Sequence, residues 1–592
     1  MAELEWTLTG PRSTRFDDVY FQLEDGLAES RAVFLAGCGL PQRFAGRAHF
    51  CVGELGFGSG LNILALLDLW RRYRPGPEAR LHIVTIEAYP MTADEAARAL
   101  SAFPELAELA ADLLGGWPDG RRGPHWIDFP DLGVSLQILI GEVLPALEGL
   151  GAQMDAWFLD GFAPSKNPDM WSDAVLARVA ALSAPGCVAA TFTVAGDVRR
   201  RLQDGGFTVE KKPGFGRKRH RLEAVMPGEA SDVPAPRIAV IGAGIAGASL
   251  VRAFRRVGLA ADLFDAKGLG AGASGNPAAL ISPRLDAGLG EVAQLHAQAY
   301  ARAIQIYRTE TMSALIGRGA LQLEKAPKDP GRFDVIAGWD GWSPGGMTRP
   351  EVAETARRLG EPVETASLRL RDALVLEPAV VLAAFAGDAS VDKARVTGIE
   401  PQGARWRVMA GARSETYDVV CITAGFDTGG LAPLPDLRPV RGQVTVARLR
   451  LTGEAVAWGG YLIPTRTGLL FGATHQRGDA DGGVREADDL ANLAALATVR
   501  PVLAQAVAAK GVKGRAGVRA AMPDQSPLCG PAAPGLYLLT ALGGRGFTLA
   551  PLLAEQIAAE VAGIPRPMDH RLARRLDPLR YAGSTEPGKT AP

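Results

Sequence analysis

The chain has 592 residues, more than one hydrophobic core usually serves, so we expect several domains. Apolar residues make up 47% of the chain and charged residues 22%, which excludes a disordered or fibrous protein and indicates a globular one. Lys and Arg number 64 against 65 Asp and Glu, so any attraction to nucleic acid must be local.

Neither a targeting segment nor a membrane span is evident. The N-terminus has no basic segment followed by an apolar run, and no apolar run of about twenty residues occurs. Five widely spaced cysteines form no C-x-x-C pair, and none has a His at metal-ligand spacing; they are Cys38, Cys51, Cys187, Cys421 and Cys529. We therefore expect a cytoplasmic protein, most simply a monomer, without a membrane partner, a disulfide framework or a metal.

Strands and helices alternate over the first two hundred residues. A helix is predicted over 61–70, after the first of five apolar strands, which are predicted at 50–55, 81–86, 134–140, 155–159 and 187–192. This alternation is typical of an α/β fold with a doubly wound parallel sheet, whose ligand lies at the carboxyl ends of the strands.

The loop after the first strand reads E-L-G-F-G-S-G and resembles the first motif of the class I, Rossmann-like S-adenosylmethionine-dependent methyltransferases. The resemblance implies that Gly56, Gly58 and Gly60 lie against the methionine part of S-adenosylmethionine. It also implies that Glu87, which ends the second strand, holds the ribose, and that Glu142 meets the adenine. A nucleotide-binding Rossmann unit of another kind is the alternative.

Asp160 ends the fourth strand and opens the loop D-G-F-A-P-S-K-N-P-D-M-W. A carboxylate at this end of the sheet can hold or deprotonate an attacking amine, which N-methylation requires, so Asp160 is the candidate catalytic residue. Phe162 and Trp171 are candidates for stacking on a base. Alternatively, Asp160 caps the next helix and Trp171 packs in the core.

A basic segment follows between residues 196 and 222, with nine Lys or Arg against three Asp or Glu. Its run 212–220 contains Gly214-Phe215-Gly216 and predicts a mobile loop or a hairpin. Basic side chains around an aromatic one suit phosphate contacts and base stacking, although a solvated face is the alternative. The candidates for contacting RNA are Lys211, Lys212, Arg217, Lys218 and Arg219.

Residues 227–236 are small, polar and proline-rich, which predicts a linker between a domain at 1–226 and a second domain at 237–568, with a tail at 569–592. The second domain opens with a strand at 237–241, Gly242, Gly244 and Gly247 at G-x-G-x-x-G spacing, and a helix at 246–256. A second strand at 261–264 ends in Asp265. With its strand, helix and acid in place, this unit predicts dinucleotide binding rather than a glycine-rich turn.

Further motifs extend the dinucleotide unit toward an FAD site. Ser274, Gly275 and Asn276 lie in a glycine-rich loop, Gly425 follows a strand at 417–422, and a strand at 536–542 runs into G-G-R-G-F and a helix at 548–561. These patterns resemble the D-amino-acid oxidase and glycine oxidase group of flavoproteins. The resemblance implies a glycine-oxidase-like domain that binds FAD, non-covalently since Cys529 lies in an apolar turn, through residues that also include Gly544, Arg545, Gly546 and Phe547.

A β-rich substrate subdomain is expected at roughly 300–370 and 440–515. Its candidate substrate-binding residues are Arg441, Gln443, Tyr461, His475 and Arg477, because an Arg would pair with a substrate carboxylate bidentately. Each of these residues is equally well explained by a structural role.

Taken together, F-D-D-V-Y-F, E-L-G-F-G-S-G-L-N, D-G-F-A-P-S-K-N-P-D-M-W, G-F-G-R-K-R, the Ser-Gly-Asn loop and G-G-R-G-F resemble the MnmC family. The family is one of bifunctional enzymes of 5-methylaminomethyl-2-thiouridine biosynthesis in bacterial tRNA. One departure is Ala279, where glycine is expected.

The resemblance implies that the FAD domain removes the carboxymethyl group of 5-carboxymethylaminomethyluridine as glyoxylate. The methyltransferase domain then methylates the resulting 5-aminomethyl group. The alternatives are a fused amine oxidase and N-methyltransferase acting on free sarcosine or glycine, and an RNA-binding scaffold with decayed sites.

Overall fold

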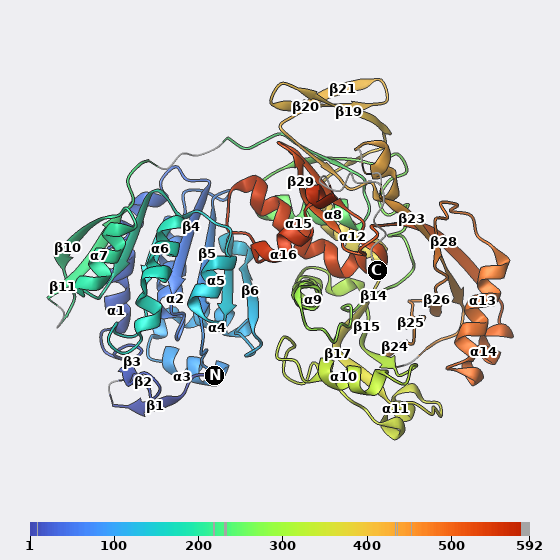
Figure 1. The fold of residues 1–592 in the computed structure, drawn as a ribbon, viewed down its shortest axis with the longest axis horizontal. Coiled ribbons are helices and arrows are strands. Elements are labelled where there is room, and N and C mark those ends of the chain that lie inside the picture. Colours follow the sequence, from blue (N-terminus) through green and yellow to red (C-terminus); the bar gives the residue numbers. More distant parts are fainter. Residues whose placement is uncertain are drawn as a thin grey trace. The chain divides into compact units, whose positions relative to one another are not determined.

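The protein divides into two compact units in a computed structural model (Figure 1). The model describes residues 1–8, 10–216, 219–229, 234–432, 434, 436–451 and 453–581. Unit 1 comprises Met1–Pro234 with Ala559–His570, and unit 2 comprises Ala235–Ala558 with the chain from Arg571 onward.

Unit 1 is built on an eight-stranded sheet in which β7, β5, β4, β8 and β9 are parallel neighbours. An antiparallel strand is added at one edge, and an antiparallel pair at the other. In spatial order the strands are β10 (Thr208–Pro213), β11 (His220–Val225), β9 (Ser183–Thr191), β8 (Met154–Leu159), β4 (His49–Leu55), β5 (Arg80–Glu87), β7 (Val134–Ile140) and β6 (Gly123–Phe129).

The predicted strands of this sheet are confirmed, with one difference at β9. That strand begins at Ser183 rather than at Cys187, and its register against β8 shifts between the Met154–Ser183 and Ala156–Val188 pairs. Pro185 and Gly186 lie within this irregularity. A proline has no N–H to donate to a neighbouring strand, so it is tolerated where the regular pairing of the strands is interrupted.

Helices pack on the sheet of unit 1 and bury an apolar core. The predicted helix after β4 is α2 (Leu61–Tyr73), and most of its residues are buried. A small sheet of β1 (Leu4–Thr7), β2 (Gly10–Ser13) and β3 (Asp18–Val19) precedes it. The remaining helices are α1 (Gly26–Ser30), α3 (Ala93–Leu100), α4 (Ala107–Gly115), α5 (Val143–Gly149), α6 (Asp173–Ala181) and α7 (Gly196–Asp204).

Unit 2 contains a six-stranded sheet whose strands are parallel except for β29. Its order is β18 (Val391–Asp392), β13 (Ala261–Phe264), β12 (Ile238–Ile241), β22 (Val419–Ile422), β30 (Leu536–Thr540) and β29 (Leu528–Ala533). The strands predicted for the dinucleotide unit are confirmed. The strand predicted at 417–422 is divided, because Tyr417 ends a separate strand, β21 (Arg413–Tyr417).

A ten-stranded mixed sheet forms the β-rich part of unit 2. Its strands are β14 (Ala279–Ile281), β15 (Leu315–Leu323), β16 (Met347–Thr348), β17 (Ser367–Leu376), β23 (Arg438–Ala447), β24 (Ala455–Ala457), β25 (Tyr461–Pro464), β26 (Leu469–Gly472), β27 (Gln476–Arg477) and β28 (Val512–Ala521). A three-stranded sheet of β19 (Val396–Gln402), β20 (Arg405–Ala410) and β21 is separate.

The helix predicted after β12 is α8 (Ile245–Arg256). The fully buried Arg252 on α8 forms ion pairs with Glu310 and Glu555, so its charge is compensated inside the protein. The other helices are α9 (Glu291–Glu310), α10 (Asp329–Ala337), α11 (Val352–Leu359), α12 (Pro378–Ala386), α13 (Glu486–Ala497), α14 (Pro501–Ala508), α15 (Gly546–Ala562) and α16 (His570–Arg575). Residues 559–562 of α15 and residue 570 of α16 belong to unit 1.

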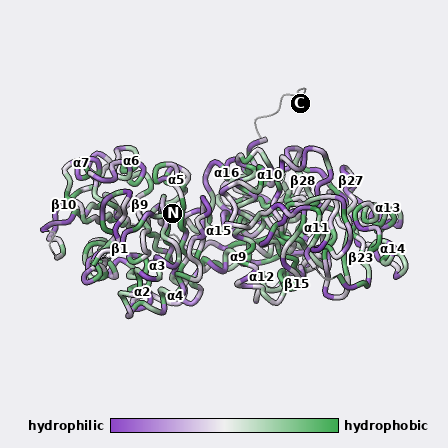
Figure 2. Tube along the Cα trace, turned by 90° about the horizontal axis from the view of Figure 1, so that it is seen from below, coloured by the Kyte–Doolittle hydropathy of each residue, from purple (hydrophilic) through white to green (hydrophobic). Residues whose placement is uncertain are grey.

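Hydrophobic and hydrophilic residues are interspersed along the whole tube of Figure 2. Among the described residues, no helix is long and apolar enough to cross a membrane. The same residues contain no group of three or more His, Cys, Asp or Glu side chains placed to hold a metal ion. All five cysteines are buried and unbridged.

Candidate active sites

The glycine loop of unit 1 lies at the carboxyl end of β4, the central parallel strand. Gly56, Gly58 and Gly60 have φ values of 84°, 53° and 77°, a left-handed backbone that glycine adopts without strain. A Cβ atom added to Gly56 would stand 3.3 Å from the Cα of Gly161, so this loop lies against the loop that begins at Asp160. Neighbouring strands thus bring the two loops together.

Glu87 ends β5 beside the same loop. Its carboxylate accepts hydrogen bonds from the backbone N–H of Gly58 (3.0 Å) and of Tyr89 (2.8 Å). Burial raises the pKa of Glu87, and these N–H donors oppose the shift because they favour the charged form. Glu142 follows the adjacent strand β7 and is exposed at the start of α5. Both acids therefore lie at the carboxyl ends of neighbouring strands, where the sequence predicts them.

Asp160 follows β8, on the other side of β4 from Glu87. One carboxylate oxygen accepts a hydrogen bond from Asn62 Nδ2 (2.8 Å), and the other accepts one from the backbone N–H of Gly161 (2.8 Å). Asn62 lies in the first turn of α2, directly after the glycine loop. The orientation of the Asp160 carboxylate is thus set partly by Asn62, which directly follows the loop proposed to hold the methyl donor.

Four aromatic rings gather around this loop. Phe162 stacks on Phe16 with ring centroids 4.8 Å apart and meets Tyr20 edge-on at 5.0 Å, while Phe16 lies 6.0 Å from Tyr89. A Cβ atom on Gly58 would stand 3.3 Å from the Tyr20 ring. The aromatic side chains therefore border the glycine loop, and residues 16–21 contribute to the site.

The N-terminal segment is tied to the Asp160 loop by polar contacts as well. Asp18 accepts a hydrogen bond from the Ala163 N–H (2.9 Å), and Lys166 forms an ion pair with Asp17 (2.6 Å). In the sequence, F-D-D-V-Y-F contributes only to the family resemblance. Nothing local in its two acids and its aromatic residues indicates that this segment contacts the Asp160 loop. Trp171, in contrast, is 1% exposed and donates to the Phe162 carbonyl, so it packs in the core instead of stacking on a base.

The basic segment ends in an antiparallel hairpin of β10 and β11, as one of the two predicted alternatives. Lys211 and Arg219 are exposed, and neither makes an ion pair with another described residue. Lys212 pairs with Glu210 (2.5 Å), which reduces its free charge. Arg217 and Lys218 lie outside the described residues.

In unit 2 the dinucleotide loop has the tight geometry that its glycines predict. A Cβ atom on Gly247 would stand 1.9 Å from the Gly242 carbonyl oxygen, and one on Gly242 would stand 2.6 Å from the Thr423 carbonyl oxygen. Asp265 ends β13 and accepts a hydrogen bond from the Ala243 N–H (2.9 Å). These close approaches and the acid beside them fit the pyrophosphate and ribose of FAD.

The loop with Ser274, Gly275 and Asn276 returns to the dinucleotide loop. Ser274 Oγ accepts a hydrogen bond from the Ile245 N–H at the start of α8 (3.0 Å), and Asn276 Oδ1 accepts one from Arg515 (2.6 Å). Gly425 begins η7 (Gly425–Gly430) with φ 59°. The loop at 274–276, Arg515 and Gly425, which are far apart in the chain, thus lie near the dinucleotide loop that follows β12.

The G-G-R-G-F segment forms η8 (Gly543–Arg545) and the first turn of α15. A Cβ atom on Gly546 would stand 3.1 Å from Ile245, which places this turn beside the dinucleotide loop. The Phe547 carbonyl accepts a hydrogen bond from Tyr307 (2.6 Å). The N-terminus of α15 can therefore direct its N–H groups toward a cofactor held by the loop.

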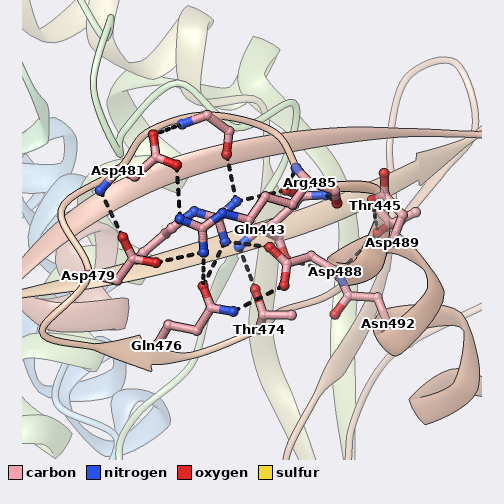
Figure 3. A network of polar contacts seen from close by, with 12 residues as sticks. Gln443, Thr445, Thr474, Gln476, Asp479, Asp481, Arg485, Asp488, Asp489 and Asn492 are labelled. Atoms are coloured by element: carbon pink, nitrogen blue, oxygen red, sulfur yellow. Dashed lines mark hydrogen bonds and ion pairs between the residues drawn. The ribbon is translucent and has the colours of Figure 1, made fainter.

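Arg441 and Gln443 are buried members of a polar network, in which Figure 3 labels Gln443 and its neighbours. The Arg441 guanidinium pairs with Asp488 of α13 and donates to Gln443, Gln476 (2.9 Å) and the Gly483 carbonyl (2.6 Å). Both residues are 0% exposed. Their side chains join β23 to α13, which fits the structural role that the sequence left open as the alternative to substrate binding.

The pleat of the sheet explains this correction. In the pairing of β23 with β28, Arg441 lies opposite Val518, whereas Val440 lies opposite Arg519. Successive residues of a strand point to opposite faces, so Arg519 and Arg441 are on different faces. A Cβ atom on Gly442 would stand 2.6 Å from Arg519 Nη2, consistent with this placement.

Arg519 is the basic residue that the sequence reasoning missed. It forms no hydrogen bond or ion pair with another described residue. Its charge lowers the pKa of His475 further, beyond the larger effect of desolvation, and opposes the burial that raises the pKa of Tyr461. Tyr461 and His475 thus lie near one unpaired guanidinium, while His475 and Arg477 are exposed. Counting alternate positions along R-A-G-V-R could have identified Arg519.

Comparisons with known proteins assign a methyltransferase domain to the first part of the chain and an FAD-dependent oxidoreductase domain to the second. Residues 104–227 match the S-adenosyl-L-methionine-dependent methyltransferase family, and residues 237–560 match the FAD dependent oxidoreductase family. The glycine loop at 56–60 lies outside the first match.

Over nearly its full length the chain is similar to curated proteins named "tRNA 5-methylaminomethyl-2-thiouridine biosynthesis bifunctional protein MnmC". It is 49% identical to the one from Caulobacter sp. (strain K31), covering 98% of this chain and 97% of that protein. It is 43% identical to the one from Maricaulis maris (strain MCS10), covering 95% and 93%. The structure of L-proline dehydrogenase from P. horikoshii covers 59% of this chain and 98% of its own, with a TM-score of 0.50 and 15% identity, and shows a shared fold.

Proposed function

The chain belongs to the MnmC family of bifunctional proteins, and on this premise we propose that it modifies a uridine of tRNA in two steps. It is a bifunctional enzyme that combines an S-adenosylmethionine-dependent methyltransferase with an FAD-dependent oxidoreductase. In the proposed sequence the oxidoreductase converts 5-carboxymethylaminomethyluridine, with or without the 2-thio group, to the 5-aminomethyl form. The methyltransferase then makes the 5-methylaminomethyl product.

The observation that carries the proposal for unit 1 is the oriented carboxylate of Asp160. S-adenosylmethionine supplies the methyl group when bound. Asp160, held by Asn62 and Gly161, accepts a hydrogen bond from the substrate amine and takes the proton that the amine must lose to attack. We assign the cofactor to Gly56, Gly58, Gly60, Glu87 and Glu142.

For unit 2 we assign the substrate carboxylate to Arg519, with Tyr461 and His475 beside it. A free guanidinium can bind a carboxylate bidentately and so fix the methylene carbon that is oxidised. FAD, when bound, accepts the hydride from that carbon.

The oxidation proposed for unit 2 proceeds through an imine. Loss of a hydride and the N–H proton converts the secondary amine to an imine. Water adds to its carbon, the C–N bond breaks, and the products are a primary amine on the uridine and glyoxylate. This chain's residues orient the carboxylate for the first step.

The tRNA itself is proposed to contact the β10–β11 hairpin through Lys211 and Arg219. The free-amino-acid alternative has no comparable support, because the relatives of this chain over its full length are named for tRNA modification. As a tRNA enzyme the protein belongs in the cytoplasm, and a metal-free monomer remains our proposal, checked by light scattering and metal analysis.

The test uses purified full-length protein and tRNA carrying 5-carboxymethylaminomethyluridine, with nucleoside mass spectrometry. Without S-adenosylmethionine we expect loss of the two-carbon acid, and with it the gain of one methyl group. Untouched tRNA together with consumption of free sarcosine or glycine would overturn the proposal.

A further inference from the structure

Three basic side chains of unit 2 converge from distant parts of the chain. Arg284 lies in the loop after β14, His296 lies in α9, and Arg545 ends η8. The charges of Arg545 and Arg284 both act on His296, and the charge of Arg284 acts on Arg545, so the three groups form one electrostatic cluster.

Hydrogen bonds hold the three elements together. Thr548, in the first turn of α15, donates to the Ser282 carbonyl at the start of the Arg284 loop (3.1 Å). Tyr307 of α9 donates to the Phe547 carbonyl (2.6 Å). Hydrogen bonds between these segments therefore hold the backbone positions of the three basic residues near one another.

The cluster has no paired counter-charge among the described residues. The side chains of Arg284 and Arg545 form no hydrogen bond or ion pair there, and His296 is 5% exposed with Nδ1 unpartnered. Asp286, the acid whose charge reaches His296, accepts a hydrogen bond from its own loop at Gly288. A buried polar atom without a partner is costly, which indicates a ligand.

Other arginines of unit 2 behave differently. Arg252, Arg441 and Arg500 are buried, and each is paired with at least one carboxylate; the partners are Glu310 and Glu555, Asp488, and Glu361. The fold thus supplies counter-charges where arginines serve structure. Arg284 and Arg545, which are less buried, have no such counter-charge among the described residues, and in this they resemble Arg519.

The electrostatics of the cluster favour an anion. Desolvation, followed by the charges of Arg545 and Arg284, lowers the pKa of His296 to about 3. Although the Arg545 side chain is accessible, surrounding protein partly desolvates it and lowers its pKa, and Arg284 adds to the shift. A negative charge between these groups would relieve their repulsion.

We propose that Arg284, His296 and Arg545 form an oxyanion site of unit 2, and that this site takes a backbone phosphate next to the modified uridine. It lies beside Arg519, because a Cβ atom on Gly544, the residue before Arg545, would stand 3.8 Å from Arg519 Nη1. This assignment rests on the proposed function, in which Arg519 already holds the substrate carboxylate. A nucleotide within RNA carries phosphates as well as that carboxylate. Two guanidinium groups and one imidazole N–H supply the donors that a phosphate accepts.

Binding is tested first with inorganic phosphate as the probe, by ³¹P NMR line broadening with FAD-loaded full-length protein. We expect saturable broadening that Arg284→Gln abolishes. Arg407→Gln, an exposed and unpaired arginine on β20, is the matched control and should leave it intact. Equal broadening in wild type and Arg284→Gln, or none with the FAD-loaded wild type, overturns the proposal whether or not tRNA is a substrate.

The source of the oxyanion is identified by kinetics of glyoxylate release. With substrate tRNA, Arg284→Gln should raise KM about tenfold and change kcat less than twofold. With the isolated 5-carboxymethylaminomethyluridine nucleoside, which has no phosphate, its kinetics should match those of the wild type. An equal loss with nucleoside and tRNA would assign the cluster to the carboxylate instead and overturn the phosphate assignment. Failure of the wild type on both substrates counts against the proposed function alone.

Discussion

At the scale of single residues, two carboxyl groups near the methyl-transfer site differ in their environments. Glu54 of β4 is 1% exposed, and burial raises its pKa well above the usual value. Thr85 donates to one of its oxygens (2.7 Å). Asp160, in contrast, accepts two N–H hydrogen bonds, which favour the charged form of a carboxylate that can bind the substrate amine.

Replacing Asp160 by Asn removes the proton acceptor but keeps an oxygen that Asn62 can reach. We expect methyl transfer to fall by about 10²–10⁴-fold, the usual contribution of a general base. Release of glyoxylate should be unchanged. Methylation of 5-aminomethyluridine tRNA is measured, with Asp169→Asn in the same loop as the control. Full activity of Asp160→Asn would show that the carboxylate is dispensable.

His296 gives unit 2 a specific dependence on pH. Its folded pKa of about 3 lies below the unfolded value of about 6.5, so the unfolded chain binds a proton more readily. The resulting stability is present above pH 6.5 and is lost as pH falls toward 3, by up to about 1.4 kcal/mol per pH unit. In His296→Asn this loss should be absent in urea unfolding of unit 2 between pH 7 and 5. Parallel pH profiles of variant and wild type would contradict the assignment.

At the scale of elements, the pleat of β23 and β28 assigns different tasks to arginines that lie near one another. Arg441 points to α13 and is neutralised by Asp488, whereas Arg519 points to the opposite face and is unpaired. The same alternation that secures one face of the sheet therefore leaves a binding group on the other.

Variants of these two arginines should separate stability from binding. Arg441→Met leaves Asp488 buried without its partner and should destabilise unit 2 by about 3–5 kcal/mol. Arg519→Gln should leave stability within about 1 kcal/mol but raise the KM for oxidation about 10–100-fold, the cost of a lost charged hydrogen bond. Urea unfolding and glyoxylate release measure the two effects. The opposite pattern would exchange the two roles.

The β10–β11 hairpin is the second element with a testable role. Lys211→Gln together with Arg219→Gln should weaken tRNA binding and reduce the slope of log affinity against log salt by about 1.4–1.8, since each phosphate contact contributes about 0.7–0.9. Lys212→Gln should have a smaller effect, because Glu210 already pairs with Lys212. Fluorescence anisotropy with labelled tRNA at several salt concentrations measures this. An unchanged slope would identify the hairpin as a solvated face.

At the scale of the whole molecule, each unit carries its own cofactor loop on its own parallel sheet. The two chemistries are therefore separable by single substitutions within one intact chain. Such variants test the order of the proposed steps, because the product of one site is the substrate of the other.

Gly247→Ala should abolish FAD binding, since its Cβ would stand 1.9 Å from the Gly242 carbonyl oxygen. The purified protein should be colourless and inactive on carboxymethylaminomethyl tRNA, yet still methylate aminomethyl tRNA. Gly272→Ala is the matched control, because nothing lies within 4 Å of its Cβ position. A yellow Gly247→Ala protein would contradict the cofactor geometry. Loss of methylation as well would show that the units depend on each other.

Local patterns in the sequence were sufficient for the parts of both sites that lie on consecutive residues. A strand, a glycine loop and an acid at the end of the next strand are read in order, and the structure has Gly56, Glu87, Gly242 and Asp265 in this arrangement. Such motifs are predictable because the backbone of a tight turn depends on its own residues. Asp160 was predictable in the same way, as the residue that follows an apolar strand.

Only the tertiary structure decided which side chains meet. Arg441 and Arg519 look alike in sequence, but the register of two strands buries one and frees the other. Likewise, Arg284, His296 and Arg545 are joined only by the packing of a loop, α9 and η8. Contacts between distant segments depend on strand register and helix packing, which no single stretch of sequence determines. The sequence by itself therefore determined the two chemistries, and the fold decided which arginines could serve them.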